Sequence, residues 1–197
     1  MTTKKKFVYS NNDYNSGDGM LTNVWGPSIW HFLHTMSFNY PVDPTAHDKE
    51  HYKSFITNLQ YTLPCKYCRI NLAKNLKTFP ITSDVLKNRE TFSKYVYDLH
   101  NLINKMLKKK IKITYEEVRD RYEHFRSRCT ITPKVKRLIK TIKKESGCTE
   151  PMYGKKSKCI IKIVPQETRG KSFQMDKQCF KTKSKSKSKT KKYKYNI

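Results

Sequence analysis

Four stretches of this chain repeat apolar side chains at intervals of three and four residues, and prolines separate them. The repeats cover residues 23–40, 52–63, 68–76 and 84–107. This spacing gathers apolar side chains on one face of a helix. The strict alternation that is typical of strands is essentially absent before residue 158. The pattern therefore predicts an all-α fold, an antiparallel four-helix bundle.

Capping residues indicate where these helices begin. Asn23 can cap the first helix, with a proline in its first turn, and Ser83 or Asp84 can cap the fourth. Thr114 and Glu117 have the spacing of a capping box, so a short fifth helix is expected to begin there. We assign six apolar residues wholly to core packing, namely Phe32, Leu33, Phe55, Leu59, Leu99 and Leu102.

The net charge of +26 is concentrated near the end of the chain. Residues 130–197 hold 21 Lys or Arg against 4 Asp or Glu. Such a segment buries too little apolar surface to offset the entropy of ordering it. We therefore expect a flexible lead over residues 1–22, a folded domain over residues 23–128, and a basic, largely disordered extension over residues 129–197.

The extension ends in a low-complexity segment in which Lys alternates with Ser or Thr, at residues 181–194. Clustered lysines neutralise phosphates, so nonspecific contact with nucleic acid is possible there. A solvated tail without a dedicated partner is the simpler interpretation. We expect neither a membrane span nor a cleaved secretion signal, because long apolar runs are missing from the sequence.

Residues 64–68 read Pro-Cys-Lys-Tyr-Cys, in which Cys65 and Cys68 have the spacing of a redox-active pair. A helix that begins at these cysteines directs the positive end of its dipole at them, which favours the thiolate. Zinc sites and thioredoxin-like enzymes use the same spacing. A zinc site needs a second ligand pair that the other cysteines do not offer, and a thioredoxin fold needs flanking strands. We therefore expect a redox role and no metal.

Three segments together carry a resemblance to a known family. Residues 25–34 read Trp-Gly-Pro-Ser-Ile-Trp-His-Phe-Leu-His, and residues 64–68 contain the cysteine pair. Residues 100–107 read His-Asn-Leu-Ile-Asn-Lys-Met-Leu. In order and spacing, these segments closely resemble the flavin-linked sulfhydryl oxidases of the Erv/ALR family, over about residues 23–125. The resemblance implies a helical bundle that holds FAD noncovalently at its mouth, with the disulfide beside the isoalloxazine ring.

The resemblance also implies which residues form the site. Cys65 and Cys68 take the catalytic roles. The residues expected to contact FAD are Gly26, Trp30, His34, His100, Asn101, Asn104, Lys109 and Tyr122. Trp30 and His34 are one helical turn apart, so they share a face on which a flat ring can rest. Each of these aromatic residues, taken alone, is more often part of a core.

The implied function is that of an FAD-dependent thiol oxidase that forms disulfide bonds in protein substrates. A substrate thiolate attacks Cys65 and releases Cys68, which lies nearer the flavin. Electrons pass from the dithiol through the cysteine pair to FAD and then to molecular oxygen, which gives hydrogen peroxide. The alternative is a basic structural or nucleic-acid packaging protein with a non-catalytic helical domain.

The chain departs from the family at a structural disulfide. Many members join the fourth helix to the following loop through a cysteine that corresponds to Tyr97 here, and the partner region around Ile113 and Thr114 also lacks cysteine. We therefore expect stability to come from packing, bound FAD or dimerisation. A homodimer is the association that the resemblance implies.

Four cysteines follow the expected folded domain. Family members often carry a flexible cysteine pair that relays electrons from the client protein, and Cys148 and Cys159 are our candidates for such a shuttle. Cys129 and Cys179 can equally pair or stay reduced, since connectivity does not follow from sequence. Four incidental thiols are an equally good interpretation.

The chain is rich in Lys, Asn and Tyr and poor in Ala, a bias that AT-rich coding DNA produces. A thiol oxidase without a secretion signal suggests a large cytoplasmic DNA virus, because such a virus would need its own route to disulfides in a reducing compartment. We therefore expect a viral protein located in the cytoplasm of the infected cell, in the virion, or in both.

Overall fold

The computed structural model describes residues 9–110, 113–127, 148, 151–152, 155–170 and 173–179. It divides into two compact units. The first comprises Met1–Glu123 and Ile160–Gln174, and the second comprises His124–Cys159 and Met175–Ile197. All of the predicted helices belong to the first unit. The predicted basic extension lies largely outside the described residues, including Cys129, residues 133–142 and the tail at residues 181–194.

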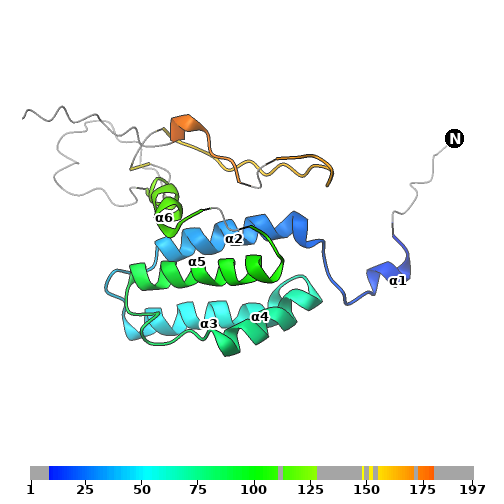
Figure 1. The fold of residues 1–197 in the computed structure, drawn as a ribbon, viewed down its shortest axis with the longest axis horizontal. Helices are drawn as coiled ribbons and strands as arrows, with labels where there is room; N and C mark the ends of the chain where they lie inside the picture. Colours follow the sequence, from blue (N-terminus) through cyan, green and yellow to red (C-terminus); the bar gives the residue numbers. More distant parts are fainter. Residues whose placement is uncertain are drawn as a thin grey trace, which may run out of the picture. The chain divides into compact units, whose positions relative to one another are not determined.

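Five helices make up the body of the first unit, and the predicted all-α bundle with a short additional helix is confirmed. In Figure 1, α2 and α5 lie side by side, α3 lies beside α4, and α6 packs against α2. The described residues contain no strand beyond isolated bridges. The bounds are α2 Thr22–Phe38, α3 Ala46–Thr62, α4 Lys66–Thr78, α5 Arg89–Met106 and α6 Tyr115–Glu123.

Helix α2 begins two residues earlier than predicted. Its N-cap is Leu21, which makes no capping side-chain hydrogen bond, so Asn23 does not cap the helix and Pro27 lies inside it. The chain just before the helix is held in place, because the Met20 carbonyl accepts a hydrogen bond from Trp25 Nε1 at 3.1 Å. That tether, rather than a capping side chain, sets where the helix starts.

The starts of α3 and α5 also differ from the prediction, and both have capping boxes. Thr45 and Asp48 exchange hydrogen bonds at the start of α3, before the apolar repeat begins. Asn88 caps α5, whereas the expected caps, Ser83 and Asp84, lie in the preceding turn. At α6, by contrast, the predicted capping box is present, with both of its hydrogen bonds at 3.2 Å or less.

One apolar core holds the bundle together. Its largest fully buried ring is that of Tyr40, whose hydroxyl donates to the Leu86 carbonyl at 3.0 Å while its ring lies 4.6 Å from that of Phe92. A buried tyrosine needs such a partner, since an unsatisfied hydroxyl costs about 1–3 kcal/mol. The other buried members of the core are Leu33, Ile56, Leu72, Ile81, Tyr95, Val96 and Leu99.

Two of the six residues assigned to packing are exposed instead. Leu33 and Leu99 are buried, as predicted, but Phe32 and Phe55 remain 50% and 38% exposed. Their rings contact each other at 5.9 Å, on the adjacent helices α2 and α3. The prediction failed for them because periodicity identifies an apolar face without showing whether the same chain covers it.

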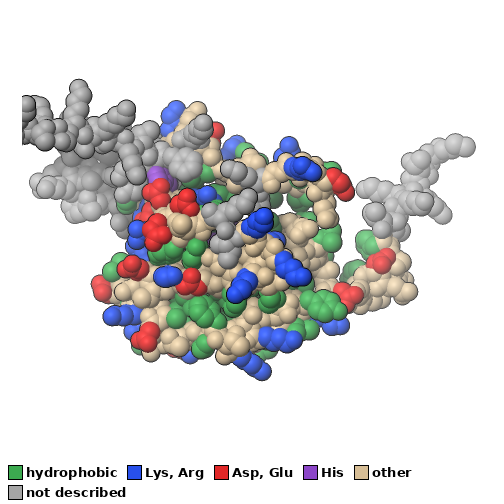
Figure 2. Space-filling view, in the orientation of Figure 1, with side chains coloured by type: hydrophobic (Ala, Val, Ile, Leu, Met, Phe, Trp, Pro, Cys, Tyr) green, Lys and Arg blue, Asp and Glu red, His purple; other side chains and the backbone are tan. Residues whose placement is uncertain are grey.

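Charge is spread unevenly over the helices. Figure 2 shows Lys and Arg side chains distributed over the visible face, while Asp and Glu gather over α6. The acidic residues of that helix are Glu116, Glu117, Asp120 and Glu123. Within the described residues, no helix is long and apolar enough to span a bilayer.

The second unit contains little regular structure in its described residues. A 3-10 turn forms at Lys177–Cys179, and an isolated antiparallel bridge joins Ser127 to Pro151. The Met152 amide donates to the Arg126 carbonyl at 2.7 Å beside that bridge. These few contacts connect segments that are distant in sequence.

Candidate functional site

The two cysteines of the predicted redox pair lie at the start of α4. Cys65 is its N-cap, in an extended conformation, and its Sγ accepts the backbone N–H of Cys68 at 3.2 Å. The positive end of the helix dipole is therefore directed at the Cys65 sulfur, as the sequence predicted. Both thiols are free and half-buried.

Their surroundings give the two thiols different acidities. Burial, the largest single influence, raises the pKa of Cys65, but hydrogen bonds from Cys68, Thr22 and Tyr67 together outweigh it and leave the pKa lowered. The pKa of Cys68 is raised, first by burial and then by its hydrogen bond with Cys65. In the reduced pair, Cys65 is thus the preferred thiolate and Cys68 keeps its proton.

A short segment of the N-terminal lead lies against this motif. Residues 18–20, called the strap below, pair with residues 64–66 in an antiparallel bridge that sets Gly19 opposite Cys65. The Met20 amide donates to the Pro64 carbonyl at 2.7 Å, and the Lys66 amide donates to the strap at 3.0 Å. The sequence did not predict this contact, because no apolar repeat or capping pattern marks the strap.

Glycine is the only residue type that fits at position 19 of the strap. Its φ of +105° lies in the region that favours glycine. A Cβ atom added there would lie 2.5 Å from the Pro64 carbonyl oxygen and 2.9 Å from the Cys65 Cα. A larger residue at position 19 would therefore push the strap off the cysteine motif.

Helix α2 connects the thiols to the predicted aromatic residues. Thr22, its first residue, places its hydroxyl 3.7 Å from the Cys68 sulfur. Trp30 follows about 12 Å further along the same helix, at a rise of 1.5 Å per residue. Through Thr22, which also hydrogen-bonds Cys65, Cys68 thus contacts the helix that carries the aromatic groups.

Trp30, His34 and His100, three of the residues expected to contact FAD, meet between α2 and α5. The Trp30 and His100 rings stack with centroids 3.9 Å apart and an angle of 5° between their planes. His34 Nε2 lies 3.0 Å from His100 Nδ1, so one nitrogen donates and the other accepts. Two helices that are distant in sequence thus supply one continuous aromatic surface.

Both histidines are neutral at physiological pH. Burial is the main cause that lowers the pKa of His34 to about 3, and repulsion from Arg121 and from the protonated forms of His100 and His31 lowers it further. Burial, followed by the charge of Lys109, lowers the pKa of His100 to about 4. A neutral imidazole has one donor and one acceptor, and among the described residues His34 Nδ1 is buried without a hydrogen-bond partner. Such an atom costs about 1–3 kcal/mol unless another group satisfies it.

Tyr122 extends this cluster from α6. Its ring stacks on that of Phe38, and its centroid lies 5.3 Å from that of His34. Its hydroxyl lies 3.3 Å from His31 Nδ1, and burial raises its pKa to about 12. The Phe173 ring contacts both His31 and Tyr122.

The remaining predicted cofactor residues lie around this cluster. Asn101 and Asn104 are half-buried on α5, and the Lys109 amide donates to the Asn104 carbonyl at 2.8 Å just beyond the helix. Gly26 is buried on α2, yet a Cβ atom there would meet only a Thr22 methyl group at 3.5 Å. Packing within the described residues therefore does not require glycine at position 26.

The distal cysteines do not pair as the shuttle prediction assumed. Cys148 is disulfide-bonded, whereas Cys159 and Cys179 are free. Cys148 and Cys159 are therefore not joined to each other. The pairing of Cys129 lies outside the described residues, and a relay function for any of these cysteines stays a prediction.

Comparison with known proteins identifies the family. The model of the Erv1 / Alr family matches residues 27–123. A probable FAD-linked sulfhydryl oxidase of Acanthamoeba polyphaga mimivirus is 40% identical over 112 residues, which are 57% of this chain and 74% of that protein. The chain belongs to the Erv1 / Alr family.

Two further proteins are similar to this Erv1 / Alr chain. An FAD-linked sulfhydryl oxidase of African swine fever virus is 34% identical over 99 residues, which are 50% of this chain and 80% of that protein. The solved FAD-binding domain of Erv1 from Saccharomyces cerevisiae is 26% identical, with a TM-score of 0.47 over 52% of this chain and 94% of that chain.

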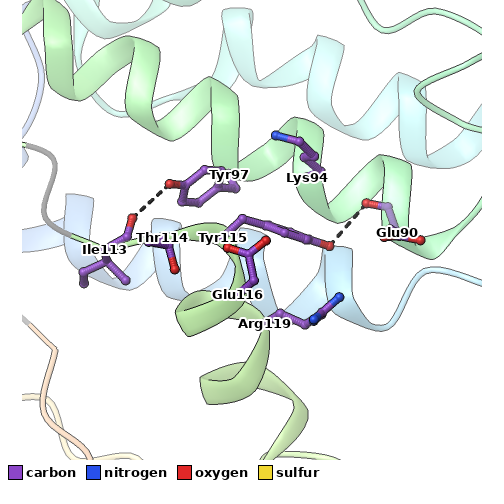
Figure 3. Close-up of a pocket in the computed structure, with 8 residues that line it drawn as sticks. All are labelled: Glu90, Lys94, Tyr97, Ile113, Thr114, Tyr115, Glu116 and Arg119. Carbon is purple, nitrogen blue, oxygen red and sulfur yellow. Dashed lines mark hydrogen bonds between the residues drawn. The ribbon is translucent and has the colours of Figure 1, made fainter.

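This Erv1 / Alr chain contains a hydrogen bond at the place of the missing disulfide. The Tyr97 hydroxyl donates to the Ile113 carbonyl at 2.9 Å, across a pocket of about 670 Å³ between α5 and α6 (Figure 3). The Tyr97 ring also meets that of Tyr115, whose hydroxyl lies 2.8 Å from Ser93 Oγ. Two tyrosines thus connect the segments that the cysteines would have joined.

Sequence reasoning missed two residues that contact the site. Thr22 touches the Cys68 sulfur, and His31 lies against Tyr122. His31 sits beside Trp30 in the recognised motif, so its position could have suggested a contact. Thr22 had no such signal, because its role depends on where α4 begins.

Proposed function

We propose that this protein is an FAD-dependent thiol oxidase that forms disulfide bonds in protein substrates and passes the electrons to oxygen. The observation that carries the proposal is the position of the Cys65–Cys68 pair. The pair lies at the N-terminus of α4 and contacts α2, the helix that carries Trp30 and His34. Membership of the Erv1 / Alr family and the named activity of its viral relatives support the same function.

The residues present fit FAD in three respects. The stacked Trp30 and His100 rings leave no space between them, but their outer faces offer a surface for a flat ring system. His34 Nδ1 is a buried polar atom that still needs a partner. Lys109 supplies positive charge near His100, suited to a pyrophosphate. When bound, FAD would take up two electrons from the thiol pair and pass them to oxygen.

The cysteines divide the thiol chemistry between them. In the oxidised pair, a substrate thiolate forms a bond with the Cys65 sulfur, the Cys65–Cys68 bond breaks, and Cys68 leaves as a thiolate. The Thr22 hydroxyl lies close enough to hydrogen-bond that leaving sulfur. A second substrate thiol then releases Cys65, whose lowered pKa makes it a good leaving group. Cys68 remains on the side of α2.

The neutral histidines hold the aromatic surface in place without adding charge to it. The hydrogen bond between His34 and His100 fixes both rings, and the stacked Trp30 ring excludes water from one side of His100. Because burial keeps both imidazoles unprotonated, their nitrogens can accept or donate hydrogen bonds to a bound ring. Their role is to bind and orient.

Oxygen uptake by the purified protein tests the proposal. We expect a yellow protein that consumes oxygen when a dithiol is added, and a Cys68→Ser variant that stays yellow but consumes none. Cys179→Ser is the matched control, since Cys179 is a free thiol that we assign neither to the site nor to the relay. A colourless protein that cannot be loaded with FAD, yet binds DNA with a steep salt dependence, would support the packaging alternative instead.

A homodimer is proposed on the exposed apolar face of α2 and α3. Phe32 and Phe55 lie on this face, beside a groove of about 380 Å³ whose lining includes Trp25, Ile29 and Leu59. Exposed aromatic side chains of this kind mark protein contacts. A second copy of the same face would cover them symmetrically.

Several sequence predictions remain proposals. The domain limits at residues 22 and 128, the FAD contacts of the individual residues, and the Cys148 and Cys159 relay belong to this group. We also infer a large DNA virus as the source, since relatives from mimivirus and African swine fever virus support it. Localisation in the infected cytoplasm or virion, and nonspecific contact between the tail and nucleic acid, are proposed on the sequence alone.

A further inference from the structure

The strap meets the cysteine motif in a geometry that suits disulfide exchange. Two backbone hydrogen bonds join the strap to residues 64–66, one on each side of the facing pair Gly19 and Cys65. This is the non-hydrogen-bonded type of antiparallel pair, in which opposite Cα atoms are about 4.5 Å apart and side chains approach closely. A disulfide requires Cα atoms about 4.4–6.8 Å apart. A cysteine in place of Gly19 on an ordinary strand would therefore face Cys65 at bonding distance.

The strap fills this backbone edge without covering the Cys65 side chain. Gly19 has no side chain, and its positive φ would aim a Cβ atom into the backbone of Pro64 and Cys65. An ordinary strand residue has a negative φ and projects its Cβ away from the facing backbone. The residues around Gly19 are exposed, so the strap is held by its backbone hydrogen bonds, the Trp25 tether and an exposed ion pair at 4.0 Å between Asp18 and Lys66.

We propose that residues 64–66 are the docking edge for an extended, cysteine-bearing segment of the client protein, and that the strap occupies this edge until the client displaces it. The client replaces both backbone hydrogen bonds and places its cysteine opposite Cys65. Recognition through the backbone accepts varied client sequences, because strand addition reads main-chain groups rather than particular side chains. This inference rests on the proposed thiol oxidase function, for which the docked cysteine is the substrate.

The exchange step follows from this placement. The client thiolate attacks the Cys65 sulfur of the oxidised pair, a client–Cys65 disulfide forms, and the Cys65–Cys68 bond breaks. Cys68 departs with the electron pair and is stabilised by the nearby Thr22 hydroxyl. No further oxidant is needed for this step, because one disulfide is exchanged for another.

A trapping assay without flavin or oxygen measures docking directly. In a Cys68→Ser background, Cys65 attacks a synthetic peptide whose cysteine carries a thiopyridyl leaving group. The new disulfide joins Cys65 to the peptide, and released pyridine-2-thione reports the rate. Dipyridyl disulfide serves as the small probe, and mass mapping separates reaction at Cys65 from reaction at Cys159 and Cys179.

Gly19→Ala should displace the strap and raise the ratio of peptide rate to small-probe rate about tenfold, the effect of one or two hydrogen bonds. Gly17→Ala is the matched control, since a Cβ atom there meets nothing within 4 Å. An unchanged or lower ratio in Gly19→Ala would overturn the proposal. Cys65 found joined to Cys159 or Cys179 before peptide is added would identify the chain's own cysteines as the occupant and overturn the client assignment.

Hydrogen exchange on the trapped complex provides a second test that keeps Gly19 intact. The Met20 amide bonds to Pro64, and the Lys66 amide bonds to the strap. When the peptide takes the strap's place, the Met20 amide should lose its protection from exchange, because it no longer donates to Pro64. The Lys66 amide should stay protected, because a peptide carbonyl replaces the strap carbonyl as its acceptor. Loss of protection at both amides, or at neither, would contradict strand exchange. If this exchange pattern is seen but the protein consumes no oxygen, the proposed oxidase function is refuted while the proposed docking edge is supported.

Discussion

At the scale of single residues, burial and the hydrogen bonds at the helix terminus determine which of the two thiols ionises more readily. The Cys65 sulfur accepts a hydrogen bond from the Cys68 backbone N–H, while the Thr22 hydroxyl contacts the Cys68 sulfur. Hydrogen bonds to a sulfur favour its thiolate, whereas burial favours the thiol. The lowered pKa of Cys65 and the raised pKa of Cys68 follow from the balance between these effects.

Removing the Thr22 hydroxyl should make both thiols less acidic, because its hydrogen bonds lower the pKa of each. In Thr22→Val we expect alkylation of Cys65 at neutral pH to slow about fivefold, with the rate levelling off at a higher pH than in the unmodified protein. Iodoacetamide labelling against pH, resolved by mass spectrometry, measures this. Thr22→Ser retains a hydroxyl and should behave normally, so equal slowing in both variants would refute the assignment.

The buried histidines should make stability depend on pH. Their pKa values in the folded protein, about 3 for His34 and about 4 for His100, lie below the ordinary 6.5. Below pH 6.5 the unfolded chain takes up protons that the folded chain cannot, so the free energy of unfolding falls as pH falls toward 4. Each histidine contributes up to about 1.4 kcal/mol per pH unit.

Urea unfolding between neutral and mildly acidic pH measures this dependence. We expect His34→Asn to reduce the slope, since it removes one of the three histidines whose pKa burial lowers, His31, His34 and His100. His47→Asn is the control, because His47 is an exposed histidine on α3. A slope in His34→Asn equal to that of the unmodified protein would show that the histidine is not buried as described.

At the scale of elements, the tyrosine contact between α5 and the segment before α6 replaces a covalent link. Tyr97→Phe removes the hydrogen bond to the Ile113 carbonyl while keeping the ring (Figure 3). We expect the free energy of unfolding to fall by about 1 kcal/mol, and thermal unfolding measures it. Tyr61→Phe, at an exposed tyrosine on α3, should change little. Equal stability of the two variants would mean that Tyr97 does not link these segments.

Apolar periodicity predicted the helices better than it predicted their ends. Spacing at three and four residues identified each long helix because burial of one face is encoded locally. The start of α2 was misplaced because no side chain caps it, and the chain before it is held by Trp25 and by the hydrogen bond from Met20 to Pro64, 44 residues further along the chain. Residue patterns within a segment carry no information about such a contact.

The distinction between local patterns and contacts of distant segments also separates the site residues that the sequence predicted from those that it did not. Trp30, His34 and His100 came from motif recognition, and the structure brings their rings together. Nothing in the sequence marked Gly19 as important. Its role depends on the Pro64 carbonyl oxygen, which would lie only 2.5 Å from a Cβ atom added at position 19. Local chemistry was predictable, whereas a close approach between distant segments was not.

At the scale of the whole molecule, the exposed face of α2 and α3 should mediate self-association. Phe32→Glu places a charge where the second copy would pack, so we expect the protein to become monomeric. Sedimentation velocity measures the change. Val42→Glu, at an exposed residue between the same two helices, should leave the dimer intact. A monomeric unmodified protein, or a dimeric Phe32→Glu variant, would contradict the proposed interface.

The most direct test of the central claim, that Cys65 and Cys68 deliver electrons to a bound flavin, is an anaerobic titration with dithiothreitol followed by flavin absorbance. We predict that the yellow colour of the purified protein bleaches as the dithiol is added, and that Cys68→Ser binds flavin equally but does not bleach. Bleaching of Cys68→Ser at the rate of the unmodified protein, or a protein that binds no flavin, would contradict the account.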